Sequence, residues 1–375
     1  MTITDLTTGQ DPSTDQASSP GERAVGTVVV AGVGGVIGRH VAIEHARLGH
    51  RVIGLSRRAP SDLPDGVEHR AVDLADPDRG ALADVGDVTH LVFGAYVEAG
   101  PPAELVAPNV ALLRGALDVA QAGGHLEHVT LYQGGKAYGA HLGGFKTPAK
   151  EDDPRLLAPN FYYAQEDVLR ERGARDGFAV TMLRPEAVLG YATGNPMNLL
   201  MAVAVYGTLC AAVGVPLAFP GSRAAYEALY QSTDAELLAR ATVWAGRSPN
   251  ADGQVFNVTN GDQYRWANLW PLLAEDFGVD VGHPLTAPLV DTMSDKEPVW
   301  QRLVERHGLR PTPWADLVQW PFADFIWNSG FDNVSSTVKL RQAGFGDCLD
   351  SEQRYLDLLA RLRADRVIPP RGATA

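Results

Sequence analysis

The chain has 375 residues, of which 45% are hydrophobic and 21% charged, and this composition is typical of a globular protein large enough for two domains. Its formal net charge of −13 at pH 7, with no long basic run, argues against a nucleic-acid or anionic-membrane partner. Cys210 and Cys348 lack the spacing of a disulfide framework or a zinc site, and none of the ten histidines has metal-ligand spacing with a carboxylate. We therefore expect no metal, and two buried thiols in a reducing compartment.

The N-terminal residues 1–23 are rich in Thr, Ser, Asp, Gln, Gly and Pro and contain no apolar core segment. This pattern predicts a disordered tail rather than a signal peptide. A cytoplasmic location is the corresponding expectation.

The stretch from Thr27 to Gly38 reads TVVVAGVGGVIG and predicts a strand, a glycine turn and a helix. Val28 to Val30 form a β-branched run typical of a buried strand, and the helical pattern extends from Val36 to Leu48. Glycines allow a tight turn and the close approach of a pyrophosphate, which rests on the N–H groups at the start of the helix. Because glycines also mark ordinary turns, the triplet alone does not decide for a dinucleotide site. The candidate phosphate contacts are Gly32, Gly34, Gly35, Val36, Ile37 and Gly38.

The second predicted strand, Arg51 to Leu55, is followed by Ser56, Arg57 and Arg58. NAD-selective folds place an acid at the end of this strand to accept hydrogen bonds from the ribose hydroxyls, whereas two guanidinium groups stand here. Both arginines are also compatible with an ordinary solvated surface. Since no acid occurs between Arg51 and Ser61, we favour a site for a 2′-phosphate and hence NADPH.

Further strands are predicted at residues 67–72, 88–95 and 126–132, with a helix at 103–122. Asp73 and Leu74 follow the first of these strands, where a dinucleotide fold meets the adenine ring, although Asp73 is also placed to cap a helix near Asp76. The almost continuous apolar run at 88–95 is typical of a parallel strand covered on both faces. Alternating strands and helices predict an α/β fold, a doubly wound parallel sheet of the Rossmann type with its ligand crevice at the carboxyl ends of the strands.

A glycine-containing loop, Gln133 to Tyr138, follows the fifth strand, and Asn160 to Asp167 then opens a helix that extends to about Arg172. Ordinary short-chain dehydrogenases carry Tyr-x-x-x-Lys on this helix, but the fourth residue after Tyr163 is Asp167. Lys136 is able to supply the missing ammonium from the loop. An ammonium near a phenol makes its O–H a better donor to a developing oxyanion and also holds a nicotinamide ribose.

At these motifs the chain resembles the progesterone 5β-reductase and iridoid synthase family, an atypical branch of the short-chain dehydrogenases. The resemblance covers nearly everything after residue 25. It is carried by Arg57-Arg58, Asp87–His90, Gly134–Tyr138, Asn160–Asp167, Arg184-Pro185, Gly207–Cys210, Asn257–Asp262 and Lys296–Trp300.

The resemblance implies an NADPH-dependent enzyme that reduces the carbon–carbon double bond of an enone or enal, with Tyr163 and Lys136 as the catalytic pair. It further implies cofactor contacts from Gln133, Lys136, Tyr163 and Pro185, and it is compatible with a homodimer. The expected substrate contacts are Tyr96 and Tyr138 near the loop, together with Met197 and Tyr206 as wall residues of the helical lobe. The chain departs from the family at Ala137, where a histidine is usual, and at Tyr96, where a plant relative has tryptophan, so the family's steroid and terpenoid substrates are not carried over.

Residues 24–190 are thus predicted to form the NADPH-binding domain, 191–369 a smaller, mainly helical substrate lobe, and 370–375 a flexible tail. The uncharged run from Leu199 to Phe219 is long enough to cross a bilayer, but its glycines and proline favour a buried helix. Residues 226–231 and 254–258 look like strands that return to the main sheet. Most of the seven tryptophans are expected in the core.

Two other functions compete with this interpretation. A carbonyl reductase or nucleotide-sugar epimerase needs the same glycine turn and tyrosine, but usually retains Tyr-x-x-x-Lys. A non-catalytic NADPH-sensing regulator tends to lose both catalytic residues, and this chain keeps Lys136 and Tyr163.

Overall fold

A computed structural model describes residues 22–60, 63–98, 100–195 and 197–373 of the chain. The predicted N-terminal tail lies outside these residues except for Glu22 and Arg23, which form ion pairs with Arg247 and Asp252. At the other end, Arg371 pairs with the buried Asp276, so this part of the predicted C-terminal tail is held against the body of the protein.

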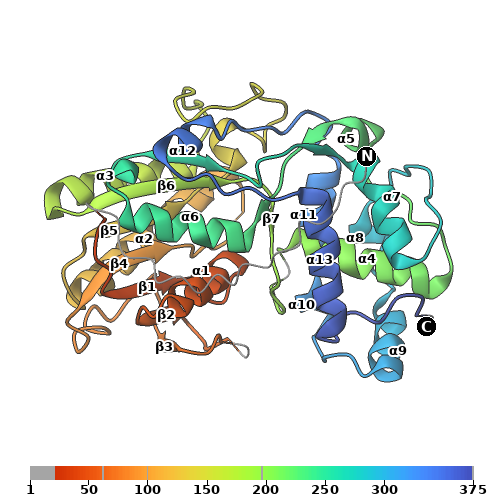
Figure 1. Cartoon of the computed structure of the whole chain (residues 1–375), viewed down its shortest axis with the longest axis horizontal. Coiled ribbons are helices and arrows are strands. Elements are labelled where there is room, and N and C mark those ends of the chain that lie inside the picture. The colour runs from red at the N-terminus through yellow and green to blue at the C-terminus, as the bar shows by residue number, and fades with distance from the viewer. Residues whose placement is uncertain (1–21, 61–62, 99, 196, 374–375) are drawn as a thin grey trace, which may run out of the picture.

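Seven parallel strands form the main sheet in the order β10-β6-β5-β4-β1-β2-β3 (Figure 1), which confirms the predicted doubly wound architecture. The chain moves outward from β1 to β3 and then returns to place β4 on the other side of β1, so the direction of winding reverses between these two strands. In such sheets the ligand crevice lies at the carboxyl ends of the strands on either side of the reversal. The strands are β1 Thr27–Ala31, β2 Val52–Ser56, β3 Val67–Ala71, β4 Val88–Phe93, β5 His128–Tyr132, β6 Ala179–Pro185 and β10 Val255–Val258.

Two pairs of helices cover the two faces of this sheet. α1 (Val36–Arg47) packs with α6 (Ala235–Arg247) on one face, and α2 (Pro102–Ala122) packs with α3 (Phe161–Asp176) on the other. Successive side chains of a strand point to opposite faces, so Val28 and Val30 join the core under α1 and α6, while Val29 joins the core under α2 and α3. A 3-10 turn, η2 (Pro249–Ala251), follows α6.

The strands predicted at 51–55, 67–72, 88–95 and 126–132, and the helices α1 and α2, agree with the structure to within two residues at each end. α3 is longer than expected and ends at Asp176, where Gly177 has a φ of 85° and terminates the helix. Because these elements follow local apolar periodicity, the sequence pattern located them well.

The two strands predicted to return to the main sheet behave differently. β10 does return and pairs with β6 at the edge. The strand predicted at 226–231 is wrong: Arg223–Glu227 forms a short helix, α5, and only Leu229–Tyr230 (β8) is extended, pairing with Tyr264–Arg265 (β11) in a separate ribbon. The Ser222 hydroxyl accepts a hydrogen bond from the Ala225 N–H at 3.1 Å, and this N-cap favours the helix over the strand. A further ribbon pairs β7 (Val188–Leu189) with β9 (Thr233–Asp234).

A helical lobe built around α4 (Leu199–Val213) lies beside the sheet, and its segments are separated in the chain by α6 and β10, which belong to the sheet layer. Most of the uncharged run is buried in the core of this lobe, as predicted, but Val213 and Val215 at the end of α4 are exposed. In the described part of the chain no helix is long and apolar enough to cross a membrane. Trp266, Trp270, Trp300 and Trp327 are almost fully buried there, which confirms their assignment to the core. The other helices are α7 Trp266–Phe277, α8 Leu289–Thr292, α9 Glu297–His307, α10 Trp314–Leu317, α11 Trp320–Trp327, α13 Ser351–Ala364 and α12 Val338–Ala343, the last of which packs on β10.

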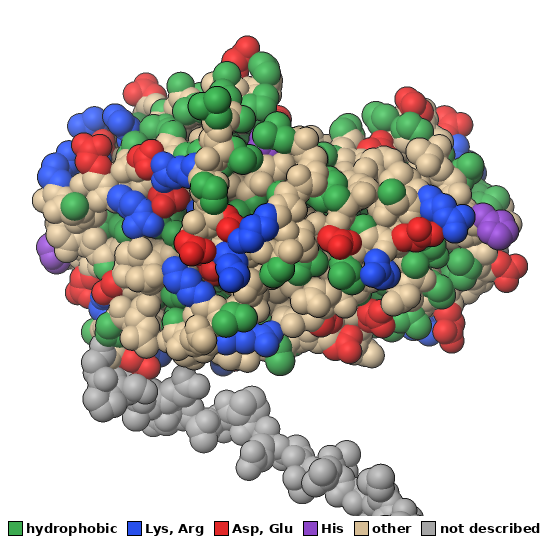
Figure 2. Space-filling view, turned by 90° about the horizontal axis from the view of Figure 1, so that it is seen from above, with side chains coloured by type: hydrophobic (Ala, Val, Ile, Leu, Met, Phe, Trp, Pro, Cys, Tyr) green, Lys and Arg blue, Asp and Glu red, His purple; other side chains and the backbone are tan. Residues whose placement is uncertain are grey.

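The two cysteines differ in their surroundings. Cys210 is buried in α4, as expected, and burial raises the pKa of its thiol to about 11. The prediction of a second buried thiol is wrong, because Cys348 is exposed on the loop between α12 and α13. Elsewhere on the surface, Figure 2 shows basic and acidic side chains interspersed over the face viewed.

A group of buried histidines lies near the amino ends of the central strands. Burial lowers the pKa of His45 to about 3 and that of His90 to about 4. His90 Nε2 donates to the Gly246 carbonyl at 3.0 Å, so its Nδ1 accepts from the Thr89 hydroxyl at 2.8 Å in the neutral form.

Acid should destabilise the fold through these histidines. Their pKa values are depressed in the folded state, so the unfolded chain binds more protons, and the stability present above pH 6.5 is lost as the pH falls towards 4. Each group should cost about 2 kcal/mol of unfolding free energy between pH 7 and pH 5. Urea unfolding at both pH values measures this loss. His90→Gln should reduce the pH dependence, whereas exchange of the exposed His125 should not change it. If the unfolding free energy changed equally with pH in the wild type and in both variants, the loss of stability would not come from His90.

Candidate active site

The glycine turn after β1 has the backbone geometry of a phosphate cradle. Gly32 has a φ of 86°, and its N–H donates to the Leu55 carbonyl at 3.0 Å, which closes the turn against β2. A side chain at Gly38 would collide with the carbonyl of Gly32, so only glycine allows α1 to start this close to the strand. Gly35 is the N-cap of α1 and provides no side-chain cap, so backbone N–H groups at this end are available to an anion. Gly34 is exposed, Ile37 is half-buried and Val36 is buried.

The end of β2 carries exposed guanidinium groups. The side chains of Arg57 and Arg58 form no hydrogen bond or ion pair with another described residue. The Ser56 hydroxyl donates to the Arg58 carbonyl at 2.7 Å and contacts His69 Nε2 at 2.9 Å, so it shapes the turn that presents the two arginines. Two unpaired guanidinium groups beside a glycine turn fit a phosphorylated ribose.

Asp73 and Leu74 lie after β3. Asp73 Oδ1 accepts a hydrogen bond from the Ala75 N–H at 3.0 Å and remains exposed, while Leu74 is buried. No helix forms at Asp76, so the alternative role of Asp73 as a helix cap is wrong: its carboxylate caps a turn instead.

The loop after β5 and the start of α3 are tied together by Asn160. Its Nδ2 donates to the Lys136 carbonyl at 2.7 Å, and its Oδ1 accepts from the Tyr162 N–H at 3.0 Å as the N-cap of α3. Lys136 lies in a short 3-10 turn, η1 (Gly135–Tyr138), and its Nζ forms no hydrogen bond or ion pair with any other residue that the structure describes. Asn160 therefore fixes the backbone of Lys136 against the first turn of α3.

Tyr163 is buried in that first turn. Its hydroxyl donates to the Ala137 carbonyl at 2.7 Å and accepts from the Leu156 N–H at 3.1 Å. Lys136 and Tyr163 are thus connected through the backbone of η1, because the Tyr163 hydroxyl is hydrogen-bonded to the carbonyl of Ala137, the residue that follows Lys136.

A network of buried polar side chains holds both ends of the loop from Gln133 to Tyr138. Arg184 Nε donates to Gln133 Oε1 at 2.7 Å, and Arg184 Nη1 donates to the Tyr138 hydroxyl at 3.0 Å. Gln133 Nε2 in turn donates to Glu166 Oε2 at 3.2 Å, and the Tyr138 hydroxyl donates to Asn257 Oδ1 at 2.6 Å. The polar atoms of Gln133 and the hydroxyl of Tyr138, predicted as cofactor and substrate contacts, are therefore engaged within the protein.

The ionisation of this network follows from its contacts. Burial acts to raise the pKa of Glu166, but hydrogen bonds from Gln133 and Arg170 outweigh it and hold the pKa below its usual range. Burial raises the pKa of the Tyr138 hydroxyl to about 12 despite the adjacent Arg184. Tyr138 therefore stays neutral and Glu166 anionic at neutral pH.

Pro185 ends β6, and its carbonyl faces Gly134 of the loop. The next residue, Glu186, was not recognised in the sequence as part of the site. It is buried, accepts a hydrogen bond from the Ser335 hydroxyl at 2.9 Å, and lies where any side chain on Gly135 would collide with it. Burial raises its pKa to about 7.

The other predicted substrate contacts are dispersed. Tyr96 is 37% exposed and its ring lies 5.6 Å from that of Phe161 at the start of α3, whereas Met197 is equally exposed in the loop before α4. Tyr206 is buried in the core of the helical lobe, where its hydroxyl donates to the Ala218 carbonyl at 2.9 Å and its ring contacts Trp270 and Trp327.

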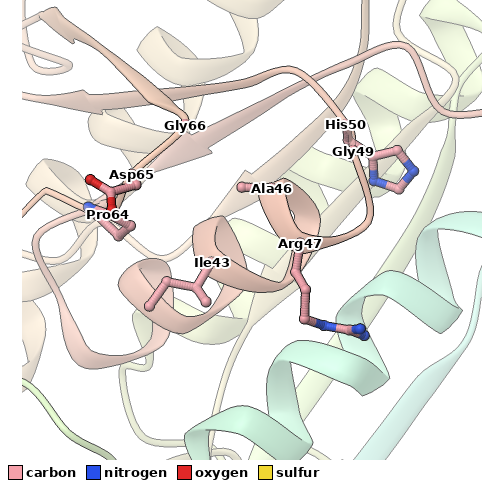
Figure 3. A pocket seen from close by; sticks show the side chains of 8 residues that line it. All are labelled: Ile43, Ala46, Arg47, Gly49, His50, Pro64, Asp65 and Gly66. Carbon is pink, nitrogen blue, oxygen red and sulfur yellow. The ribbon is translucent and has the colours of Figure 1, made fainter. Parts of the chain in front are cut away.

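A separate shallow depression of about 500 Å³ lies at the opposite end of α1 from the glycine turn (Figure 3). Its lining includes Arg47, His50 and Asp65 near the amino ends of β2 and β3. It contains none of the predicted site residues.

The model of the PRISE-like Rossmann-fold domain matches residues 67–369. The chain is 32% identical over 368 residues to (S)-8-oxocitronellyl enol synthase ISY2 of Nepeta cataria, with 91% of each chain covered. It is 30% identical over 376 residues to 3-oxo-Delta(4,5)-steroid 5-beta-reductase of Arabidopsis thaliana, with 93% of this chain and 95% of the relative covered.

Solved structures share the fold at low identity. The UDP-glucose 4-epimerase of Thermus thermophilus, in complex with NAD, superposes with a TM-score of 0.62 at 18% identity, covering 90% of this chain and 99% of the epimerase. The epimerase Mth375 of Methanothermobacter thermautotrophicus gives 0.66 at 16% identity, covering 91% and 93% of the two chains. With most of its length matched to the domain and to curated relatives, the chain belongs to the family of PRISE-like Rossmann-fold proteins.

Proposed function

We propose that this chain is an NADPH-dependent ene-reductase that reduces the carbon–carbon double bond of an activated enone or enal. The supporting observation is the Asn160 clamp, which brings the backbone of Lys136 against the turn of α3 that carries Tyr163. The family relatives named above include an enol synthase and a 5-beta-reductase, and both names are compatible with this chemistry.

The residues that would hold NADPH come from three strand ends. The glycine turn would take the diphosphate, Ser56, Arg57 and Arg58 the 2′-phosphate, and Asp73 with Leu74 the adenine side. The remaining proposed contacts, at the nicotinamide end, are Gln133, Lys136, Tyr163 and Pro185. When bound, NADPH would supply the hydride.

The protein's chemical task is then to stabilise negative charge on the substrate oxygen as an enolate forms. The Tyr163 O–H, which donates to the Ala137 carbonyl, would exchange this acceptor for the more basic enolate oxygen. Lys136, whose ammonium is unpaired among the described residues, would add positive charge to the same site. Tyr96 and Met197 are the proposed substrate contacts that remain exposed.

The position of hydride addition tests this proposal. We expect NADPH carrying deuterium at both C4 positions to label the β-carbon of a small enone, as read by NMR. Deuterium on the carbinol carbon would instead identify a carbonyl reductase, because the same tyrosine is able to protonate an alkoxide. Binding of NADPH without turnover of any enone, enal or ketone would favour the non-catalytic regulator.

A further inference from the structure

A histidine of β3 contacts the residue that ends β2. In the parallel register of the two strands, His69 lies opposite Gly54, two residues before Ser56. Residues two apart in a strand point to the same face, so the side chains of His69 and Ser56 share one face of the sheet. Because Gly54 has no side chain, no group of β2 stands between them. His69 Nε2 accordingly lies 2.9 Å from the Ser56 hydroxyl oxygen.

The direction of this hydrogen bond follows from the second contact of the Ser56 hydroxyl. The hydroxyl has one proton and donates it to the Arg58 carbonyl at 2.7 Å. Towards His69 the hydroxyl oxygen is therefore the acceptor, so Nε2 of His69 carries a proton and donates it. Two consecutive hydrogen bonds thus connect β3 through Ser56 to the backbone of Arg58, and each polarises the other and strengthens it.

These two bonds hold the backbone that carries both free guanidinium groups. Arg57 and Arg58 directly follow β2, and their side chains form no hydrogen bond or ion pair with another described residue. The direction in which they leave the strand is therefore set by the backbone of this turn. The same segment adjoins the glycine turn, since a Cβ on Gly34 would lie 3.4 Å from the Pro60 ring. His69 thus orders a segment beside the candidate diphosphate site.

We propose that His69 is a positioning residue for recognition of the 2′-phosphate of NADPH, and that it acts through Ser56 on the turn of Arg57 and Arg58. This inference rests on the proposed function, since it requires the two arginines to bind that phosphate. A turn that is ordered before the cofactor arrives loses less conformational entropy on binding, so His69 increases the affinity for the phosphorylated cofactor. NADH has no 2′-phosphate, and its affinity is independent of His69.

Replacement of His69 by phenylalanine keeps an aromatic ring and removes the N–H donor. We expect His69→Phe to weaken NADPH binding roughly two- to tenfold, the range for one lost hydrogen bond, and to leave NADH binding unchanged. His69→Gln should retain more of the NADPH affinity, because its amide N–H is able to donate to Ser56. The matched control is His125→Phe, which replaces an exposed histidine before β5 and should change neither affinity. Fluorescence titration of both cofactors into each variant measures these affinities.

A double-mutant cycle with Ser56→Ala tests whether His69 acts through the hydroxyl. In the alanine background, His69→Phe should change NADPH affinity less than twofold. Loss of the same factor in both backgrounds, or equal weakening of NADPH and NADH by His69→Phe, would overturn the inference. If Arg57→Ala and Arg58→Ala selectively weaken NADPH but His69→Phe does not, only the inference fails. If none of these variants changes the preference for NADPH, the proposed phosphate site fails as well.

Discussion

Replacement of Tyr163 by phenylalanine should lower kcat roughly a hundred- to a thousandfold. The expected loss follows from the ~2.7–4 kcal/mol that one oxyanion donor contributes to the transition state. Tyr163 is buried, and its hydroxyl has one donor and one acceptor partner, so phenylalanine fills the same space and removes only the O–H. NADPH affinity should remain, since the ring and its backbone contacts are retained. Steady-state kinetics with an enone and a fluorescence titration of NADPH measure the two quantities.

Tyr162→Phe provides a matched control on the same turn of α3. Tyr162 is adjacent in sequence, and its hydroxyl lies towards Gly134 rather than Ala137. We expect this variant to retain most of its turnover. A hundredfold loss in Tyr162→Phe together with an active Tyr163→Phe would mean that the wrong phenol has been assigned.

Replacement of Arg57 or Arg58 by alanine should weaken NADPH binding roughly ten- to a hundredfold and leave NADH binding unchanged. A charge-assisted hydrogen bond to a phosphate is worth ~1.5–3 kcal/mol, and NADH lacks the 2′-phosphate that would receive it. Since neither side chain has a partner among the described residues, the substitutions should not disturb the fold. Titration of both cofactors into each variant gives the ratio of affinities.

Two further variants sharpen this comparison. Arg58→Lys keeps the charge but loses the planar fork, so its NADPH affinity should lie between those of the wild type and Arg58→Ala. Arg79→Ala removes an exposed arginine that pairs with Asp118 away from the glycine turn, and it should change neither affinity. If Arg57→Ala and Arg58→Ala weakened the binding of NADPH and NADH equally, the two arginines would not contact the 2′-phosphate.

The outcome at individual residues shows where sequence patterns have predictive power. Gly32 and Gly38 were predicted from spacing alone, and the structure gives each a separate reason to be glycine: a positive φ at Gly32 and a backbone collision at Gly38. By contrast, Gln133 and Tyr138 were predicted to contact the ligand because they belong to the loop that carries Lys136. Their polar atoms are held by Arg184 and Asn257, which are distant in sequence.

Arg155 illustrates the same limit. No sequence pattern predicts that a guanidinium lies on the ring of Tyr163, or whether it would come from Arg155 or Arg170. Only the folded chain places one of them over the ring, at 5.1 Å.

The sequence by itself determined the doubly wound sheet, most element boundaries, the glycine turn and the loop–helix pair that carries Lys136 and Tyr163. These features depend on apolar periodicity and backbone conformation, which neighbouring residues record directly. The tertiary structure alone decided which polar side chains are engaged within the protein, which cation lies on Tyr163, that Cys348 is exposed, and that 223–227 is a helix followed by a separate ribbon. Hydrogen bonds such as Arg184 to Gln133 and Tyr138 to Asn257 join residues 51 and 119 positions apart, and no local pattern encodes a partner at that distance.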